Sequence, residues 1–256
     1  MCAMNARLLR PLASGFNPKS IANLTAWYDG ADSSSASMTL VDGKVSTWFD
    51  KSGSGNNASQ GTGANRPTLT AGGLASKSVL DFPGSPVFLG TSLTLTPPFS
   101  IVAVIKQTAR ALAPYVGPTS ISNLGFGDVF QTSTSTDFNN GKWSAWGGAR
   151  AVYGNSDASV SLVPVVVQSI VAGTSFPDDI SVFANNSGGV VTAQTAGTAP
   201  GSSVNLMLIG SRGGSGVGAE FFVGFIAEIL IYSRALSASE LARARKGMYI
   251  KWGISP

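Results

Sequence analysis

Histidine is absent from the 256-residue sequence, and cysteine occurs once, as Cys2. Without histidine, no mechanism can use an imidazole as base, acid or metal ligand, which excludes Ser-His-Asp and Cys-His catalysis and zinc–histidine sites. A single cysteine cannot close an intramolecular disulfide or build a thiolate metal site. We therefore expect the fold to be stabilised by the burial of apolar side chains.

Charge is also scarce. Charged residues make up 12% of the chain, about half of the ~25% usual in soluble domains. Arg7, Arg10 and Lys19 lie in residues 1–20, which contain no acid, whereas the middle of the chain has a slight excess of acids. A nucleic-acid-binding domain usually carries a basic stripe with interleaved aromatics, so we expect no nucleic-acid partner. Basic termini suit docking onto an acidic protein surface, although they could equally serve only to solvate the ends.

Long hydrophobic runs are missing as well. The longest candidate, residues 161–173, is interrupted by Pro164 and Gln168 and falls short of the ~18 apolar residues of a membrane span. The start, MCAMNARLLRPLASGF, lacks the apolar stretch of a secretory signal. We therefore expect a chain that does not span a membrane and is not exported by the general route.

Short apolar runs separated by turn residues characterise the chain from residue 21 onwards. The runs are rich in β-branched and aromatic residues, which favour strands, and they cover residues 24–30, 44–50, 78–82, 99–105, 163–172, 180–184, 204–210 and 221–232. The later runs are almost continuously apolar, which indicates strands covered on both faces, or on one face by an inner sheet. The pattern predicts an all-β fold, a two-sheet antiparallel jelly-roll sandwich.

One short C-terminal helix is predicted to start at Ser237. Ser237 and Glu240 have the spacing of a capping box, in which the side chain of each residue accepts a hydrogen bond from the backbone N–H group of the other. Apolar residues follow at spacings of three and four, at Leu241, Ala244 and Met248. This spacing places them on one face, so we expect the helix to lie against the sandwich.

Two parts of the chain resemble a known module. The opening LTAWYDGADSSSASMTLVDGKVSTWFDKSGSGNNASQ, with RPTL at residues 66–69 and SVLDFPGS at residues 78–85, and the closing GFIAEILIYSRALSASELARARKGMYIKWGI, residues 224–254, are similar to concanavalin A-like, laminin-G-like jelly-roll modules of phage and bacterial surface proteins. The resemblance implies a jelly-roll domain over residues 21–256 behind a basic N-terminal arm, residues 1–20. Because this fold hosts lectins, glycosidases and structural modules, it does not by itself determine the function.

The resemblance and the arm together imply a non-enzymatic phage virion surface protein, assembled in the host cytoplasm. No heptad-bearing stalk or repetitive shaft precedes the globular body, which favours a capsid decoration or head protein. The alternative is a tail fibre or a tail-associated carbohydrate-binding adhesin. Expected partners are other virion proteins, further copies of the chain and, for an adhesin, a cell-surface glycan. The arm residues expected to anchor the chain are Arg7, Leu8, Leu9, Arg10 and Phe16.

A glycan hydrolase is disfavoured by the carboxylates. Glycosidases need two carboxyl groups about 5–9.5 Å apart, and the resemblance implies that glycosidases of this fold carry an E-x-D-x-E cluster, whereas Glu228 is followed by the apolar residues 229–232. Glu220 and Glu228 would lie roughly 27 Å apart on one strand. We interpret Glu228 as a structural acid paired with a neighbouring strand or an arginine. An aspartate pair assembled from separate loops is the open alternative.

Aromatic residues gather in the segment KWSAWGGARAVYG, which lies outside the family-like parts. Its candidate contact residues for a glycan or a protein are Trp143, Trp146, Arg150 and Tyr153, since tryptophan, tyrosine and arginine are over-represented at binding surfaces. The alternative is that both tryptophans are buried in the sandwich. The other tryptophans, at positions 27, 48 and 252, are predicted to be core residues.

No organic cofactor is expected, and calcium is the metal to consider. Asp29, Asp32 and Asp50 offer the hard oxygen ligands that bind calcium. Their spacing matches no EF-hand loop. Short acids in such stretches also form turns with their own backbone, and this alternative stays open.

Overall fold

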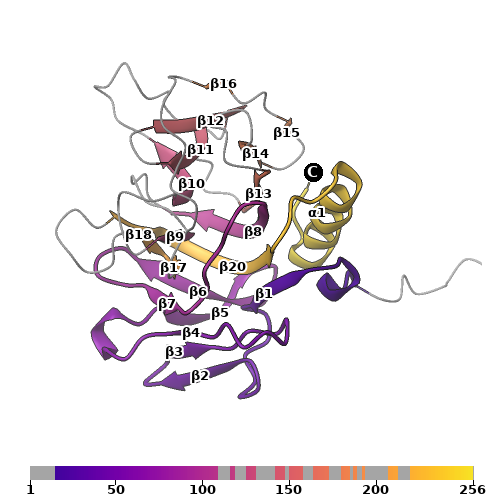
Figure 1. Ribbon diagram of the computed structural model, residues 1–256. Coiled ribbons are helices and arrows are strands. Elements are labelled where there is room, and N and C mark those ends of the chain that lie inside the picture. Colours follow the sequence, from indigo (N-terminus) through magenta and orange to yellow (C-terminus); the bar gives the residue numbers. More distant parts are fainter. Residues whose placement is uncertain are drawn as a thin grey trace, which may run out of the picture.

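The computed structural model describes residues 15–108, 116–118, 125–130, 142–147, 150–157, 164–172, 180–184, 187–188, 192–193, 207–212 and 220–255. Over these residues the chain is mostly β, with one α-helix near its C-terminal end, α1 (Ala238–Trp252) (Figure 1). Two 3₁₀ turns, η1 (Pro18–Ser20) and η2 (Gly63–Asn65), add short helical pieces. No helix in this part of the chain is long and apolar enough to cross a membrane.

The strands follow the predicted apolar runs along most of the chain. The first eight are β1 (Leu24–Asp29), β2 (Met38–Val41), β3 (Lys44–Trp48), β4 (Ala58–Ser59), β5 (Thr68–Leu74), β6 (Lys77–Pro83), β7 (Leu89–Thr91) and β8 (Phe99–Gln107). The next eight are β9 (Val116–Pro118), β10 (Gly125–Phe130), β11 (Lys142–Gly147), β12 (Arg150–Asp157), β13 (Val165–Val171), β14 (Ile180–Ala184), β15 (Ser187–Gly188) and β16 (Thr192–Ala193). The last four are β17 (Met207–Ile209), β18 (Ser211–Arg212), β19 (Glu220–Phe221) and β20 (Val223–Tyr232).

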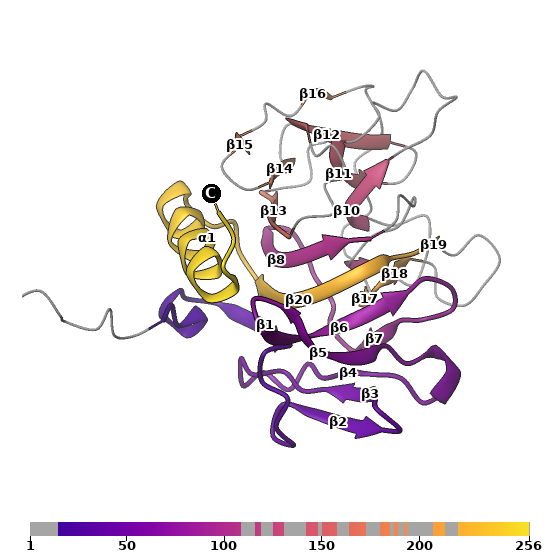
Figure 2. The ribbon, with the colours of Figure 1, turned by 180° about the vertical axis from the view of Figure 1, so that it is seen from behind.

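Strand β20 is the centre of the sheet. One of its edges pairs with β8 over residues 224–232, and its other edge pairs first with β6 and then with β1. Pairing continues from β8 to β13 and β14 on one side, and from β6 through β5, β3, β4, β7 and β17 on the other. Within the described residues, antiparallel pairing thus joins 18 strands into one curled sheet (Figure 2). The broader prediction, a mostly β chain with a short C-terminal helix, is confirmed.

The middle of this sheet is buried on both faces. Along β8, Phe99, Ile101, Ala103 and Ile105 belong to an inner cluster that also contains Trp48. The alternate residues of β8, at positions 102 and 104, belong to an outer cluster beneath α1. Because successive side chains of a strand point to opposite faces, a strand buried on both faces must be apolar at nearly every position. The near-continuous apolarity of the run at residues 99–105 has this cause.

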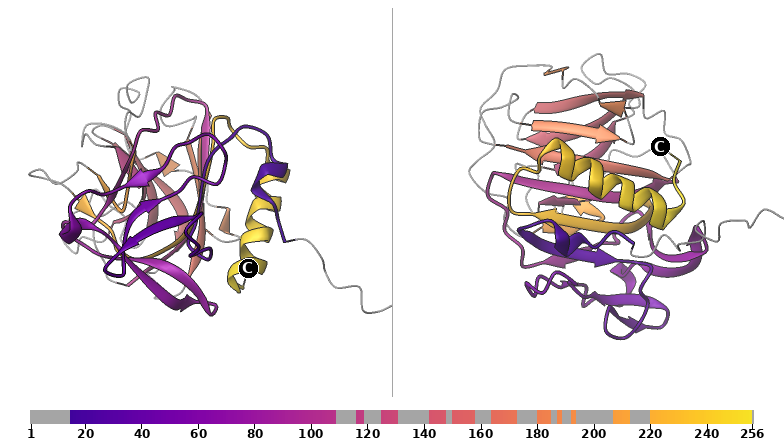
Figure 3. Two further views of the ribbon diagram at one scale, coloured as in Figure 1. Left: turned by 90° about the horizontal axis from the view of Figure 1, so that it is seen from below. Right: turned by 90° about the vertical axis from the view of Figure 1, so that its right-hand side faces the viewer.

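Helix α1 lies across the outer face of the sheet (Figure 3). The predicted capping box is present, since the Glu240 backbone N–H donates to Ser237 Oγ at 3.4 Å and the Ser237 backbone N–H donates to Glu240 Oε2 at 3.0 Å. The predicted apolar face packs on the sheet, together with Trp252. The helix ends at Gly253, whose φ of 60° is a left-handed conformation that suits glycine.

The last residues of the predicted N-terminal arm fold against the same helix. Phe16 packs on α1 so closely that a Cβ at Gly247 would lie 2.2 Å from the Phe16 Cβ atom. Arg243 of α1 donates to the Ser20 carbonyl at 3.0 Å. Phe16 therefore contacts its own chain, while the other proposed anchoring residues, at positions 7–10, lie outside the described residues.

Candidate functional site

The candidate aromatic residues lie on a β-hairpin formed by β11 and β12, whose backbone the structure describes. Tyr153 is opposite Ser144, Trp146 is opposite Ala151, and Arg150 is opposite Gly147. Positions two apart on one strand share a face, as do directly opposed positions of neighbouring strands. Positions 146 and 153 therefore belong to one face of the hairpin. Positions 143 and 150 belong to the other face, so the register divides the four candidates into two pairs.

The first two candidate calcium ligands surround a lysine. Lys51 Nζ lies 3.2 Å from Asp29 Oδ2 and 2.8 Å from Asp32 Oδ2. The Asp32 carboxylate also accepts from Ser37 Oγ at 2.6 Å. These contacts, the Lys51 hydrogen bond first, hold the pKa of Asp32 well below its ordinary value. The Lys51 ammonium therefore occupies the position between the carboxylates that a cation would need.

The third candidate calcium ligand, Asp50, is occupied by turn contacts. It accepts backbone N–H groups from Trp27 at 2.9 Å, Ser52 at 2.8 Å and Asn56 at 3.0 Å. The contacts with Ser52 and Asn56 are the alternative in which a short acid organises its local backbone, and the contact with Trp27 joins this turn to β1. In the part of the chain that the structure describes, no three His, Cys, Asp or Glu side chains converge to hold a metal ion.

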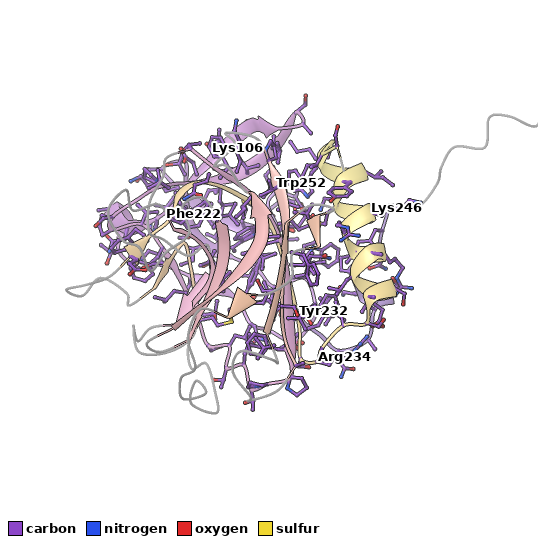
Figure 4. The ribbon with its side chains drawn as sticks, turned by 90° about the horizontal axis from the view of Figure 1, so that it is seen from above. Lys106, Phe222, Tyr232, Arg234, Lys246 and Trp252 are labelled. Carbon is purple, nitrogen blue, oxygen red and sulfur yellow. The ribbon has the colours of Figure 1, made fainter. Side chains whose placement is uncertain are left out.

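A second lysine joins Asp29 to Glu228, which is opposite it on β20. Lys251 Nζ of α1 lies 2.7 Å from Asp29 Oδ1 and 2.8 Å from Glu228 Oε2. Glu228 also accepts from the indole N–H groups of Trp27 at 2.8 Å and Trp252 at 2.6 Å. Figure 4 shows Trp252 at one end of α1 and Tyr232 and Arg234 near the other. We call Asp29, Asp32, Lys51, Glu228 and Lys251 the ionic cluster.

Burial controls the chemistry of the ionic cluster. The Glu228 side chain is only 2% exposed, and this burial raises the pKa of Glu228 against the opposing attraction of Lys251. Burial alone would lower the pKa of Lys51, but its contacts with Asp32 and Asp29 outweigh that effect and raise it. Helix α1 and two indoles cover Glu228. A substrate could therefore not reach the carboxylates of Glu228 and Asp29 with the helix in place.

Sequence reasoning identified some of these groups but not their partners. Glu228 accepts a hydrogen bond from Trp27 of the neighbouring strand β1, as one of the two predicted alternatives had it, and its ion-pair partner is a lysine rather than an arginine. The predicted core tryptophans at positions 48 and 252 are fully buried, whereas Trp27 is only partly buried. The roles of Lys51 and Lys251 were missed, because each lysine meets its acids only after distant strands and the helix have packed together.

No protein-family model matches the chain, and no curated protein is significantly similar to it. Among solved structures, a Trypanosoma rangeli sialidase in complex with the inhibitor DANA is similar at 18% identity and a TM-score of 0.52, covering 88% of this chain and 33% of that one. Domain 4 of AbnA, a GH43 extracellular arabinanase from Geobacillus stearothermophilus in complex with arabinotriose, has 14% identity, a TM-score of 0.45 and coverages of 86% and 96%. A GH54 α-L-arabinofuranosidase has 15% identity, a TM-score of 0.45 and coverages of 82% and 51%.

These comparisons correct the function inferred from the sequence. The prediction of a non-enzymatic phage virion surface protein, whether of capsid or tail, is contradicted, because the structure that is similar at a TM-score above 0.5 is a sialidase and not a phage protein. The prediction that the chain is not an enzyme is contradicted by the same finding. The missing E-x-D-x-E cluster excludes only one arrangement of catalytic carboxylates, the one on a single strand. It does not exclude glycan processing in general. At 18% identity, the likeness shows only that the chain shares the fold of part of the sialidase, of whose chain it spans about one third.

Proposed function

We propose that the chain is a glycan-recognition β-sandwich that serves glycan processing. Its fold is similar to part of a sialidase chain, and folds of this class carry their function in local sites. The proposal includes a two-layer jelly roll. Two layers are supported by the inner cluster. It contains residues of β8, β13 and β20 on one side and residues of β3, β7 and β17 on the other.

The observation that carries the proposal is the register of β11 and β12. It brings a tryptophan and a tyrosine, Trp146 and Tyr153, to the same face of one hairpin. Aromatic side chains offer large, rigid and amphipathic contact areas at low conformational-entropy cost. An indole and a phenol at these positions of adjacent strands would suit the apolar face of a sugar ring, because a phenol hydroxyl can also form a hydrogen bond.

The register also supplies the control for the experiment. Wild-type protein and the variants Trp146→Ala, Tyr153→Ala and Trp143→Ala are applied to an array of neutral and sialylated oligosaccharides, after thermal unfolding has shown that each variant is folded. We expect Trp146→Ala and Tyr153→Ala to weaken binding by about tenfold or more, as loss of an aromatic contact at a binding site does. Trp143→Ala, on the other face of the hairpin, should change it less than about twofold.

Two results would contradict the proposal: no glycan bound by the wild-type protein, or equal binding by all four proteins. Release of reducing sugar is measured in the same samples. New reducing ends, absent from a mock preparation, would indicate that the chain itself cleaves the glycan that it binds.

A further inference from the structure

A row of three residues crosses the outer face of the sheet beside the part that α1 covers. Phe225 of β20 is directly opposite Asp81 of β6 on one side and Lys106 of β8 on the other. Residues at these register positions share a face with their neighbours two positions along, Val79 and Val104, which belong to the outer cluster. Figure 4 shows Lys106 toward the same end of the molecule as Trp252 and away from Arg234.

The charges in this row are not paired with each other. Among the described residues, Asp81 has no hydrogen-bond or ion-pair partner, although it is half-buried and burial raises its pKa. Lys106 Nζ lies 5.8 Å from the centroid of the Phe225 ring and contacts no carboxylate of the described part. Around α1, by contrast, the carboxylates of Asp29, Glu228 and Glu240 are each paired with a cation.

The spacing of the strands explains why the two charges stay apart. Neighbouring strands lie about 4.8 Å apart, so the backbones at Asp81 and Lys106, separated by β20, lie roughly 10 Å apart. The partly buried ring of Phe225 lies between them. A half-buried carboxylate without a partner is costly, and a ligand that donates hydrogen bonds to it would remove that cost.

We propose that Asp81, Phe225 and Lys106 form a second glycan contact, which binds one neutral sugar ring. The partly exposed Phe225 ring would contact the apolar side of the sugar. The Asp81 carboxylate accepts hydrogen bonds from sugar hydroxyls and the Lys106 ammonium donates to sugar oxygens, and such charge-assisted bonds are the stronger ones. One charge of each sign leaves the site without a net charge that would attract an acidic glycan. This inference rests on the proposed glycan recognition.

The test uses the full chain and the variants Asp81→Asn, Lys106→Gln and Phe225→Leu. Asp42→Asn and Lys246→Gln are the matched controls, because both residues are exposed and lie outside the row. The array of neutral and sialylated oligosaccharides identifies the tightest neutral ligand, which is then titrated calorimetrically into each protein. We expect Asp81→Asn and Lys106→Gln to weaken binding about tenfold, the effect of losing one hydrogen bond to a charged group. The controls should stay within about twofold.

The outcomes separate this inference from the proposed function. If all three variants bind the neutral ligand as the wild type does while Trp146→Ala does not, the second contact is wrong and glycan recognition stands. If the wild type binds no glycan, both fail. If Asp81→Asn strengthens the binding of a sialylated ligand and leaves neutral ligands unaffected, the preference for a neutral ring is overturned. Should Phe225→Leu unfold, the two charge variants still decide.

Discussion

Glu228 lies in the middle of β20 with its carboxylate between two indole N–H groups and a lysine ammonium. A buried carboxylate is tolerated only when its charge is compensated and its oxygens accept hydrogen bonds. Both conditions are met by side chains from β1 and α1. The ionic cluster therefore ties the end of the helix to the sheet, because Lys251 contacts Glu228 and Asp29 at once.

Lys251→Met is expected to lower the free energy of unfolding by about 2–3 kcal/mol, because it leaves Glu228 and Asp29 without their shared cation. Lys246→Met, an exposed lysine of the same helix, is the control and should change it by less than about 0.5 kcal/mol. Urea unfolding at neutral pH gives both values. Burial raises the pKa of Glu228. Protonation of Glu228 at lower pH should therefore narrow the difference in unfolding free energy between Lys251→Met and Lys246→Met. An equal loss for the two variants would contradict a role for the cluster.

At the scale of elements, α1 is held at both ends. Its first turn is closed by the capping box and by Arg234, whose guanidinium lies 2.9 Å from Glu240 Oε2. The last turn is held by Lys251 and Trp252. Between them, the buried Gln168 of β13 donates to the Leu241 carbonyl at 2.9 Å. Polar contacts thus fix the position of a helix whose apolar face supplies the burial.

The first turn of α1 should weaken in acid. The pKa of Glu240 is lowered from 4.5 to about 2, first by the Arg234 side chain and then by Ser237. A folded-state pKa below the unfolded one contributes stability that is fully present above pH 4.5 and is lost as the pH falls toward 2. The unfolding free energy of the wild type should therefore fall more steeply over this interval than that of Glu240→Gln. Parallel curves from denaturant titrations across the interval would contradict this expectation.

At the scale of the whole molecule, burial is uneven. Strand β8 is almost fully buried, with the inner cluster on one face and the outer cluster on the other. Strand β2 pairs with β3 alone among the described strands, and three of its four residues are exposed. Local opening requires less free energy where few apolar contacts must break. The sheet should therefore be most stable at its middle and least stable at β2.

Hydrogen exchange measured by mass spectrometry checks this distribution. Amides of β8 and β20 are expected to exchange slowest, near the rate set by global unfolding, while those of β2 exchange by local opening and much faster. The partly buried row with Asp81 and Phe225 lies on the stable strands, so a ligand bound there should change exchange little in β8. Comparable protection of β2 and β8 would contradict the assignment of β8 as the middle of the core.

Local features of the chain could be predicted from the sequence alone. The helix start at Ser237 depends on contacts within a few residues. Strands can be recognised from the sequence because successive side chains point to opposite faces. Only the tertiary structure decided which groups meet. Trp27 and Glu228, which share a hydrogen bond, are 201 residues apart, and the register of β11 and β12 places positions 146 and 153 on the same face. Pairings between distant strands depend on the packing of the whole chain, so no local pattern encodes them.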